Sequence, residues 1–479
     1  MTDARGRSVR LSTAQLAILT VVAVASLRSL PAMATYGLGS VTLYVIPAIV
    51  FLVPTALVSA ELATGWNGGV YVWVREGLGD RLGFLAIWQQ WAPNILWFPV
   101  QLAFIAASLA YVVADPALAG SGAYTAAVIL VVYWSATLLT LRGGGLFARV
   151  GSIGGVVGTI IPGLVLVLLG AAWLGTGHPS EVPLQPPDVI PPFTGFAGLV
   201  LVVSNFVAYA GMEMNAVHAN EMGDPGRQFP RAILVGSVVI VGIFILPTIA
   251  VAIAVPPASL GLADGILVAF RTFFDAFGIG WLTPVFAAAV AFGAIASVVT
   301  WIAGPSKGLL AAARTGLLPP ALQRTNAAGV QVAILAVQGA VVTLLALLFV
   351  VVPDVDTAFF TLVDMTAAAY LVMYVLMFAA AIRLRRSAPQ VVRSYRVPAL
   401  PLVAGTGMVA SVAALALAFV PPADLTGIPP HLYPIVIGGV VVGLAVPALI
   451  LPRVRRASWD LRPAADVTAE RRAMLVHRD

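Results

Sequence analysis

The sequence predicts an all-α membrane protein with twelve transmembrane helices. Of its 479 residues, 60% are hydrophobic and only 10% are charged, and the mean hydropathy is +0.99. Soluble domains carry roughly 25% charged residues. Twelve stretches are apolar over the length of about 20 residues that a helix needs to cross a bilayer. Basic residues fall in alternate connections between these stretches, which is typical of a multi-pass membrane protein.

The predicted spans are separated by short connections that contain turn signals, such as GWNGG at 65–69 and PPADLTGIPP at 421–430. In chain order the spans cover residues 14–35, 42–62, 84–112, 122–141, 148–174, 197–219, 231–254, 283–310, 330–352, 357–382, 399–420 and 432–452.

The basic residues predict the orientation of these spans. Twenty-four of the 26 lie in the N-terminal segment, in every second connection and in the C-terminal tail. The other connections hold Arg271 and eight acidic residues. Because short cytoplasmic connections are enriched in Lys and Arg, we expect both termini to be cytoplasmic and the protein to lie in the cytoplasmic membrane. The net charge of +6 then follows from topology and does not indicate nucleic-acid binding.

The chain is predicted to form one transporter domain, residues 12–452, between a cytoplasmic N-terminus of residues 1–11 and a basic cytoplasmic tail of residues 453–479. Two spans carry polar interruptions: the first holds Arg28 and Pro31, and the sixth holds Gly211 and Glu213. Interrupted helices in corresponding positions of two halves point to a five-plus-five inverted repeat with a binding site at the midplane. We therefore expect repeats at about residues 12–175 and 196–386, followed by two further helices within 399–452.

The first interruption joins two features that are each costly in a membrane helix. The guanidinium of Arg28 keeps its charge, so its burial in hydrocarbon is unfavourable. Pro31 removes a backbone hydrogen bond and clashes with the preceding turn. An unwound segment here would offer N–H groups to the carboxylate of a small zwitterion and carbonyls to its ammonium. A proline kink that only shapes packing is the alternative.

Several classes of function have no support in the sequence. The chain has no cysteine, and its four histidines have no metal-ligand spacing. It contains no recognisable catalytic triad or phosphate-binding glycine loop, so we expect neither an enzyme nor a bound metal or cofactor. The expected partners are a small-molecule substrate and the lipid bilayer, and a homodimer is left open.

Four stretches carry a resemblance to a known family. They are YAGMEMNAVHANEMGDPGRQFPRA at 209–232, ELATGWNGGVYVWVREGLG at 61–79, WAPNILW at 91–97 and TWIAGPSKGLLAAARTGLLP at 300–319. Together they resemble the amino acid–polyamine–organocation permeases, and most of all the glutamate/γ-aminobutyrate antiporter branch. The resemblance implies the leucine-transporter-type fold with broken first and sixth helices, alternating access and α-amino acid substrates.

The resemblance also implies site residues. Ser26, Leu27 and Arg28 fall on the unwound part of the first span, where relatives bind substrate. Arg28 departs from the uncharged or aromatic residue common in relatives. It could bind an anionic substrate, form a structural ion pair with an internal acid, or extend to the cytoplasmic side.

Other residues are implied along the third, sixth, eighth and tenth spans. Asn94 matches a substrate-contacting asparagine, and Glu213 matches a glutamate that couples binding to protonation. Asp364 is a second intramembrane acid, which either pairs with Arg28 or faces water near the outer end. The aromatic residues Phe206, Tyr209, Trp301 and Tyr370 could close over the substrate, although packing is the likelier role of any single one.

Ser152 is informative because many relatives have a lysine near this point of the fifth span, where its ammonium takes the place of a sodium ion. Either Arg28 supplies the missing positive charge, or Ser152, Ser297 and Thr300 bind a cation through their oxygen atoms. The sequence therefore predicts a secondary amino acid transporter, working by exchange and favouring acidic or anionic amino acids. A proton- or sodium-coupled uptake symporter is the alternative, and a membrane receptor that does not transport is the rival from another class.

Overall fold

The computed structural model describes residues 12–143, 146–191, 195–196, 200–214, 222–351, 355–421 and 429–461. These residues form eighteen α-helices and no strand longer than a single bridge. The helices are α1 (Thr13–Val24), α2 (Leu30–Ala34), α3 (Gly39–Pro47), α4 (Val53–Gly65), α5 (Gly69–Leu78), α6 (Asp80–Val112), α7 (Gly122–Leu141), α8 (Leu146–Gly155), α9 (Ile161–Gly175), α10 (Leu201–Ala208), α11 (Pro225–Ala254), α12 (Gly265–Ala276), α13 (Thr283–Ala313), α14 (Val332–Ala346), α15 (Leu348–Val351), α16 (Val355–Ser387), α17 (Leu400–Leu417) and α18 (Tyr433–Ile450).

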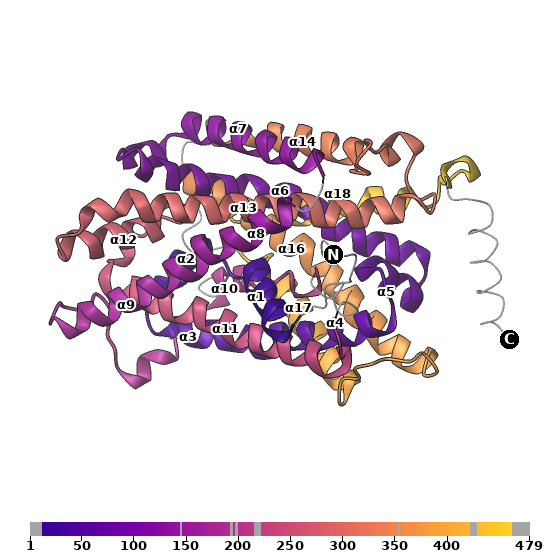
Figure 1. The fold of residues 1–479 in the computed structure, drawn as a ribbon, viewed down its shortest axis with the longest axis horizontal. Coiled ribbons are helices and arrows are strands. Elements are labelled where there is room, and N and C mark those ends of the chain that lie inside the picture. Colours follow the sequence, from indigo (N-terminus) through magenta and orange to yellow (C-terminus); the bar gives the residue numbers. More distant parts are fainter. Residues whose placement is uncertain are drawn as a thin grey trace, which may run out of the picture.

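Most of the long helices run along the long axis of the molecule (Figure 1). Helix α6 lies inside the bundle and packs against α13, α16 and α7, and its side chains are mostly buried. Helices α3 and α4 form one continuous span through a π-helical turn at Ala48–Leu52, and a second π-helical turn at Val156–Ile160 joins α8 to α9. Helix α10 packs against α16, and α1 touches α13, so these elements meet beside the buried α6.

The helices account for eleven of the twelve predicted spans. Ten stretches are long and apolar enough to cross a membrane, and the bent pair Thr13–Val24 and Leu27–Ala34 makes an eleventh. The sixth predicted span is described only in part, as α10 and a 3-10 turn at residues 212–214, and residues 215–221 lie outside the described part of the chain. The protein is thus a multi-pass membrane protein, while the count of twelve and the inverted repeat stay predictions.

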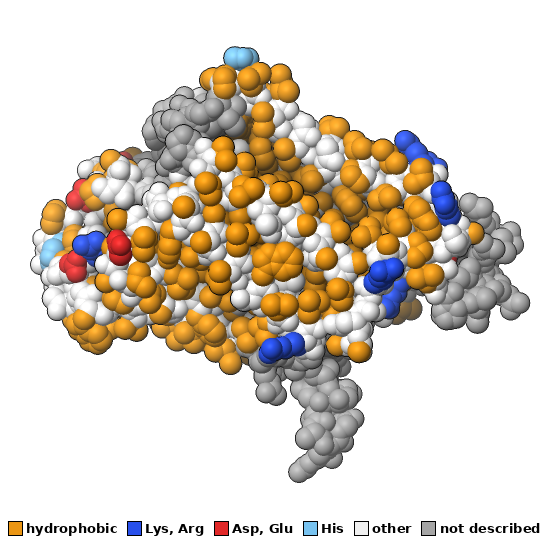
Figure 2. Space-filling model, turned by 90° about the horizontal axis from the view of Figure 1, so that it is seen from above, with side chains coloured by type: hydrophobic (Ala, Val, Ile, Leu, Met, Phe, Trp, Pro, Cys, Tyr) orange, Lys and Arg blue, Asp and Glu red, His pale blue; other side chains and the backbone are white. Residues whose placement is uncertain are grey.

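The surface agrees with membrane embedding. In Figure 2 hydrophobic side chains cover the middle of the visible face, most Lys and Arg side chains lie towards the right, and the acidic side chains lie near the left end. Helix α5 lies towards the right end and α12 towards the left end (Figure 1). We call the end that holds α5 and the last turns of α16 the Arg-rich end. The charge separation expected from the sequence is thus also present in the folded protein, although which end faces the cytoplasm stays a prediction.

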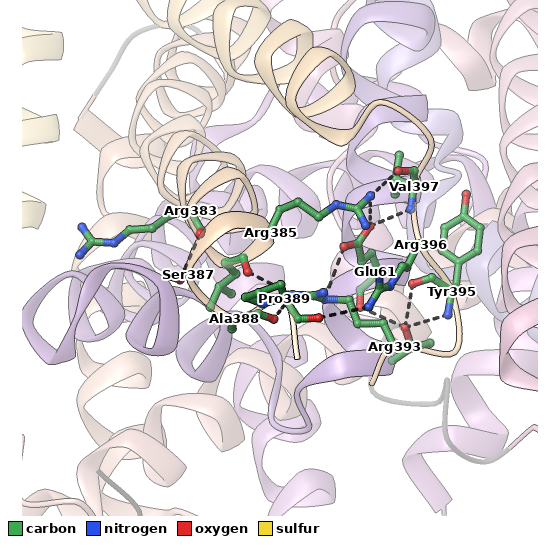
Figure 3. A network of polar contacts seen from close by, with 12 residues as sticks. Glu61, Arg383, Arg385, Ser387, Ala388, Pro389, Arg393, Tyr395, Arg396 and Val397 are labelled. Atoms are coloured by element: carbon green, nitrogen blue, oxygen red, sulfur yellow. Dashed lines mark hydrogen bonds and ion pairs between the residues drawn. The ribbon is translucent and has the colours of Figure 1, made fainter. Parts of the chain in front are cut away.

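A buried carboxylate ties three segments together at the Arg-rich end. Glu61, near the end of α4, pairs with Arg385 at 3.2 Å and with Arg393 at 3.5 Å, and it accepts a hydrogen bond of 2.7 Å from the N–H of Val397 (Figure 3). The guanidinium of Arg393 also lies 4.8 Å from the ring centroid of Trp66. The Glu61 side chain is 3% exposed and that of Arg393 is 1% exposed. This Glu61 cluster therefore fastens the segment between α16 and α17 to α4.

We expect Glu61→Gln to lower the free energy of unfolding by about 3 kcal/mol, because removing one partner of a buried ion pair leaves the other charge uncompensated. The matched control is Glu76→Gln. This substitution removes a carboxylate that pairs with Arg75 near the surface, where the Glu76 side chain is 41% exposed. Exposed pairs contribute roughly 0–1 kcal/mol. Thermal unfolding of the two purified variants in the same detergent checks this. Equal stability of the two variants would contradict a stabilising role for the Glu61 cluster.

At the opposite end, Asp264 precedes α12 and accepts a hydrogen bond of 3.2 Å from the hydroxyl of Tyr111 at the end of α6. Burial raises the pKa of the Asp264 carboxyl above its ordinary value, and the hydrogen bond from Tyr111 opposes this in part. The folded state therefore holds the proton at pH values where the unfolded state has lost it. The contribution of Asp264 to the free energy of unfolding is then fully present below the pKa that this carboxyl has in the unfolded state. It is lost as the pH rises through the folded pKa.

We therefore expect Asp264→Asn to flatten the pH dependence of thermal stability. Asparagine can still accept the Tyr111 hydrogen bond but does not titrate. The unfolding temperature of the wild type should fall relative to that of the variant as the pH rises from about 4, near the ordinary aspartate pKa. Asp275→Asn, at a side chain that is 59% exposed, is the control. Parallel curves for the wild type and Asp264→Asn would contradict this interpretation.

Candidate substrate site

The first span is broken at the residues where the break was predicted. Helix α1 ends at Val24, the side chain of Ser26 accepts a hydrogen bond of 3.3 Å from the N–H of Arg28, and a 3-10 turn covers Leu27–Ser29 before α2 begins. The two halves are bent by 42°. Pro31 stands in the first turn of α2, where its missing N–H costs no helical hydrogen bond. The break itself therefore precedes the proline, which starts the second half.

The sixth span is interrupted at Gly211, as predicted. Helix α10 ends at Ala208, and Gly211 has a φ of +108°. Side chains rarely tolerate such a φ, and a Cβ there would also lie 3.2 Å from the ring of Trp301. Glycine thus permits a sharp turn that places Glu213 in the bundle interior, where it is 1% exposed.

A cavity of about 40 Å³, which we call the central cavity, lies beside the first break. It is lined from the first span by Ser26 and Arg28, from α6 by Asn94 and Trp97, from α13 by Ser297 and Trp301, and from α16 by Thr366 and Tyr370, with small apolar residues of the first span and of the region around α10. Its polar groups are thus hydroxyls, an amide and one guanidinium. Among the described residues that line it, Arg28 carries the only charge.

Arg28 is buried, at 8% exposed. Its guanidinium carbon lies 5.5 Å from the ring centroid of Phe359, and its Nε makes no hydrogen bond. No carboxylate in the described part of the chain pairs with it. The lack of such a pair argues against the structural ion pair that the sequence left open. The burial of the Arg28 side chain argues against its extension to the cytoplasmic side.

Glu213 is held by donors from three helical segments. Its carboxylate accepts hydrogen bonds from Tyr374 OH at 2.7 Å, Tyr370 OH at 3.1 Å, Gln90 Nε2 at 3.1 Å and the N–H of Gly211 at 3.2 Å. We call these five residues the Glu213 cluster. Tyr370 belongs to this cluster and also lines the central cavity. The Glu213 cluster is thus connected to the central cavity through one side chain.

Asp364 is placed differently from either expectation. It is fully buried, so it does not face water, and its partner is the hydroxyl of Tyr433 in α18 rather than Arg28. Its Oδ1 atom has no hydrogen bond. Arg28 instead packs against Phe359, more than one turn earlier along α16, while Asp364 accepts its hydrogen bond from α18.

A second cavity, the side cavity, has a volume of about 150 Å³ and lies between the first span, α8 and α13. Ser152, Ser297 and Thr300 line it together, along with Ser26, Leu27 and Gln101. The three residues expected to form the alternative cation site are thus close to one another. Thr300, which can also be expected near the substrate from its place on the eighth span, lies on this side cavity and not on the central cavity.

The sequence missed some residues and misplaced others. Phe206 packs against Phe51, and Tyr209 donates its hydroxyl to the carbonyl of Tyr44, so neither lines a described cavity. Asn94 does line the central cavity, and its amide also donates to the carbonyl of Gln90. The missed residues are Gln90, Trp97, Thr366 and Tyr374. Three of them lie four positions from Asn94 or Tyr370, so helical spacing from these two could have found them.

Comparisons with known proteins agree with this architecture. The family model described as amino acid permease matches residues 11–442. The chain belongs to the amino acid permease family. It is 34% identical to a glutamate/gamma-aminobutyrate antiporter of Lactococcus lactis over 88% of this chain and 85% of that protein. It is 38% identical to an uncharacterized transporter of Legionella pneumophila over 92% of this chain and 96% of that protein.

A probable agmatine/putrescine antiporter of Lactococcus lactis is 24% identical over 80% of this chain and 81% of that protein. The permease is therefore a membrane transporter of the amino acid–polyamine–organocation superfamily, close to the glutamate/γ-aminobutyrate antiporter branch that the four stretches indicated.

Proposed function

We propose that this permease exchanges amino acids across the cell membrane by alternating access and favours acidic or otherwise anionic ones. The observation that carries the proposal is Arg28. It is a buried guanidinium that pairs with no carboxylate among the described residues, and it lines the cavity at the break of the first span. A buried unpaired charge in a membrane protein is costly and marks a functional site by default. An anionic group of the substrate supplies the missing partner.

The two halves of the first span offer the remaining contacts. A helix ends with carbonyls that lack intrahelical partners, and the next helix begins with free N–H groups. The carbonyls around Val24 suit the substrate ammonium, and the N–H groups that follow Ser26 suit a carboxylate. Arg28 then meets a second anionic group. This arrangement favours a dicarboxylic amino acid over a cationic one.

The Glu213 cluster gives the exchange a means to respond to protons. Tyr370 and Tyr374 both donate to Glu213, and Tyr370 also borders the central cavity. When Glu213 takes up a proton, at least one of these hydroxyls has to turn, because the carboxyl becomes a donor. The shape of the central cavity then depends on whether Glu213 is protonated.

Two relatives support exchange, since one is named as an antiporter and the other as a probable antiporter. Counterflow in proteoliposomes tests it. Vesicles loaded with unlabelled glutamate should accumulate labelled glutamate, and empty vesicles should not, with or without a proton or sodium gradient. Uptake into empty vesicles that follows an ion gradient would contradict exchange. Binding without any uptake would favour the receptor interpretation.

The side cavity supports ion-coupled symport as a second candidate. Ser152, Ser297 and Thr300 present oxygen atoms to one cavity, and hard cations prefer oxygen ligands. In that case uptake into empty vesicles should need sodium, and Ser152→Ala, which lies on the side cavity and not on the central cavity, should weaken the dependence on sodium while leaving counterflow of preloaded substrate in place.

The proposed orientation places the Arg-rich end in the cytoplasm. The chain has no native cysteine, so single cysteines can be labelled cleanly. We expect a cysteine at Trp281, which is 71% exposed, to react with an impermeant reagent in intact cells, and one at Val392, which is 85% exposed, to react only after lysis. The reverse pattern would overturn the orientation.

A further inference from the structure

Arg28 also borders a third, smaller cavity, which shares no other lining residue with the central cavity. This Arg28–Ser29 pocket has a volume of about 20 Å³. Its polar lining comes from Arg28, Ser29 and Ser204, and its apolar lining from Ala32, Leu262, Phe359 and Val363. None of the described residues that line it is acidic. The pocket therefore presents one positive charge within an otherwise hydroxylic and apolar wall.

Two buried polar atoms in this lining lack a partner. The Nε atom of Arg28 and the Oγ atom of Ser29 make no hydrogen bond, and the two residues are 8% and 6% exposed. A buried hydrogen-bonding group without a partner costs about 1–3 kcal/mol, and more when it is charged. Both atoms come from the same short turn, and both can donate a hydrogen bond. Two such donors beside a fixed positive charge define an anion-binding environment.

The interaction with Phe359 does not replace a counter-ion. A cation over an aromatic ring gains about 0.5–2 kcal/mol, whereas the effective cost of burying an unpaired ion is several kcal/mol. A water molecule could satisfy the two donors, but it would not compensate the charge. We therefore propose that the Arg28–Ser29 pocket binds a small monovalent anion, of the size and charge of chloride, as the counter-ion of Arg28 in the substrate-free permease.

The size of the pocket favours an inorganic anion over the carboxylate of a substrate. A cavity of about 10–15 Å³ on this measure holds one water molecule, and a volume of about 20 Å³ leaves room for one slightly larger particle. A carboxylate attached to an amino acid backbone needs more space and an open path. It meets Arg28 from the central cavity instead. The two anions then share one guanidinium from two separate cavities, so each weakens the binding of the other.

The test uses purified wild-type permease without substrate, with chloride replaced by gluconate at constant ionic strength. Chloride should raise the unfolding temperature in a saturable way, since a ligand of the folded state stabilises it by mass action. Ser29→Ala removes one donor and should raise the chloride concentration for half-maximal effect by at least about tenfold. Thr125→Val is the matched control, because Thr125 is also buried with an unpaired hydroxyl but lies on α7. It should respond to chloride as the wild type does.

Competition gives a second readout that does not depend on folding. In the wild type, chloride should weaken the binding of labelled glutamate, and in Ser29→Ala this inhibition should need at least about tenfold more chloride. No saturable chloride effect in the wild type would overturn the proposal, as would equal chloride effects in wild type and Ser29→Ala. Weakened glutamate binding in Ser29→Ala without any chloride effect would also overturn it, since the pocket would then belong to the substrate. None of these results bears on exchange itself, which counterflow measures.

Discussion

Arg28→Ala should fold as well as the wild type and lose substrate binding by at least about 30-fold. Truncating one partner of a buried charge pair costs about 2–5 kcal/mol, and each 1.4 kcal/mol corresponds to about a factor of ten in affinity. The measurement is the affinity for labelled glutamate in purified, correctly folded variant. Wild-type affinity there would exclude a contact between Arg28 and the substrate.

The same variant separates the substrate interpretation from the structural ion pair. If Arg28 neutralised a buried acid, its removal would leave a carboxylate unpaired and cost about 3–5 kcal/mol of stability. Glu213 instead accepts hydrogen bonds from its own cluster, and Asp364 accepts one from Tyr433. We therefore expect the unfolding temperature of Arg28→Ala to match or exceed that of the wild type. A large drop that Glu213→Gln or Asp364→Asn restores would favour the ion pair.

Two arginine variants sharpen the result. Arg28→Lys keeps the charge but loses the planar fork that binds a carboxylate through two donors, so its affinity should fall between those of wild type and Arg28→Ala. Arg271→Ala is the control, because Arg271 is 58% exposed and pairs only with the exposed Asp275 at 3.6 Å. Loss of glutamate binding in Arg271→Ala would indicate that the assay reports general charge and not the central cavity.

The breaks in the helices were predictable because they depend on local chemistry. Arg28 and Pro31 are both unfavourable inside a continuous membrane helix, and the structure bends the first span between Val24 and Leu27. Gly211 marked the second break because a positive φ needs glycine. The spans themselves follow from hydropathy over windows of about 20 residues. Each of these signals lies within one short stretch of the sequence.

The partners of the buried acids were not predictable in the same way. Asp364 bonds to Tyr433, 69 positions further along the chain, and Glu213 bonds to Gln90, 123 positions earlier. Such pairs depend on how helices rotate and cross, which the periodicity of a nearly uniformly apolar helix does not encode. The same reason explains why Tyr209 was assigned to the substrate although its hydroxyl bonds to the carbonyl of Tyr44. An aromatic residue on the correct span can face either way.

Glu213→Gln should keep the fold and remove the pH dependence of exchange. Glutamine has nearly the shape of glutamate and can still accept hydrogen bonds from Tyr370 and Tyr374 through its amide oxygen. It cannot take up a proton, so the coupled turn of Tyr370 beside the central cavity no longer depends on pH. A titrating carboxyl changes its protonated fraction by up to about tenfold per pH unit away from its pKa. The exchange rate of the variant should vary by less than about twofold over the pH range in which the wild-type exchange rate changes most.

The measurement is the initial rate of glutamate counterflow at matched internal and external pH. Tyr370→Phe is the informative companion, because it removes one hydroxyl from the Glu213 cluster and keeps the ring that lines the central cavity. It should retain a pH dependence through Tyr374 but shift the pH at which exchange changes. Asp364→Asn should leave the pH profile as in the wild type, since its partner Tyr433 does not line either the central or the side cavity. If Glu213→Gln keeps the wild-type profile and Asp364→Asn loses it, the titrating group of this permease is Asp364.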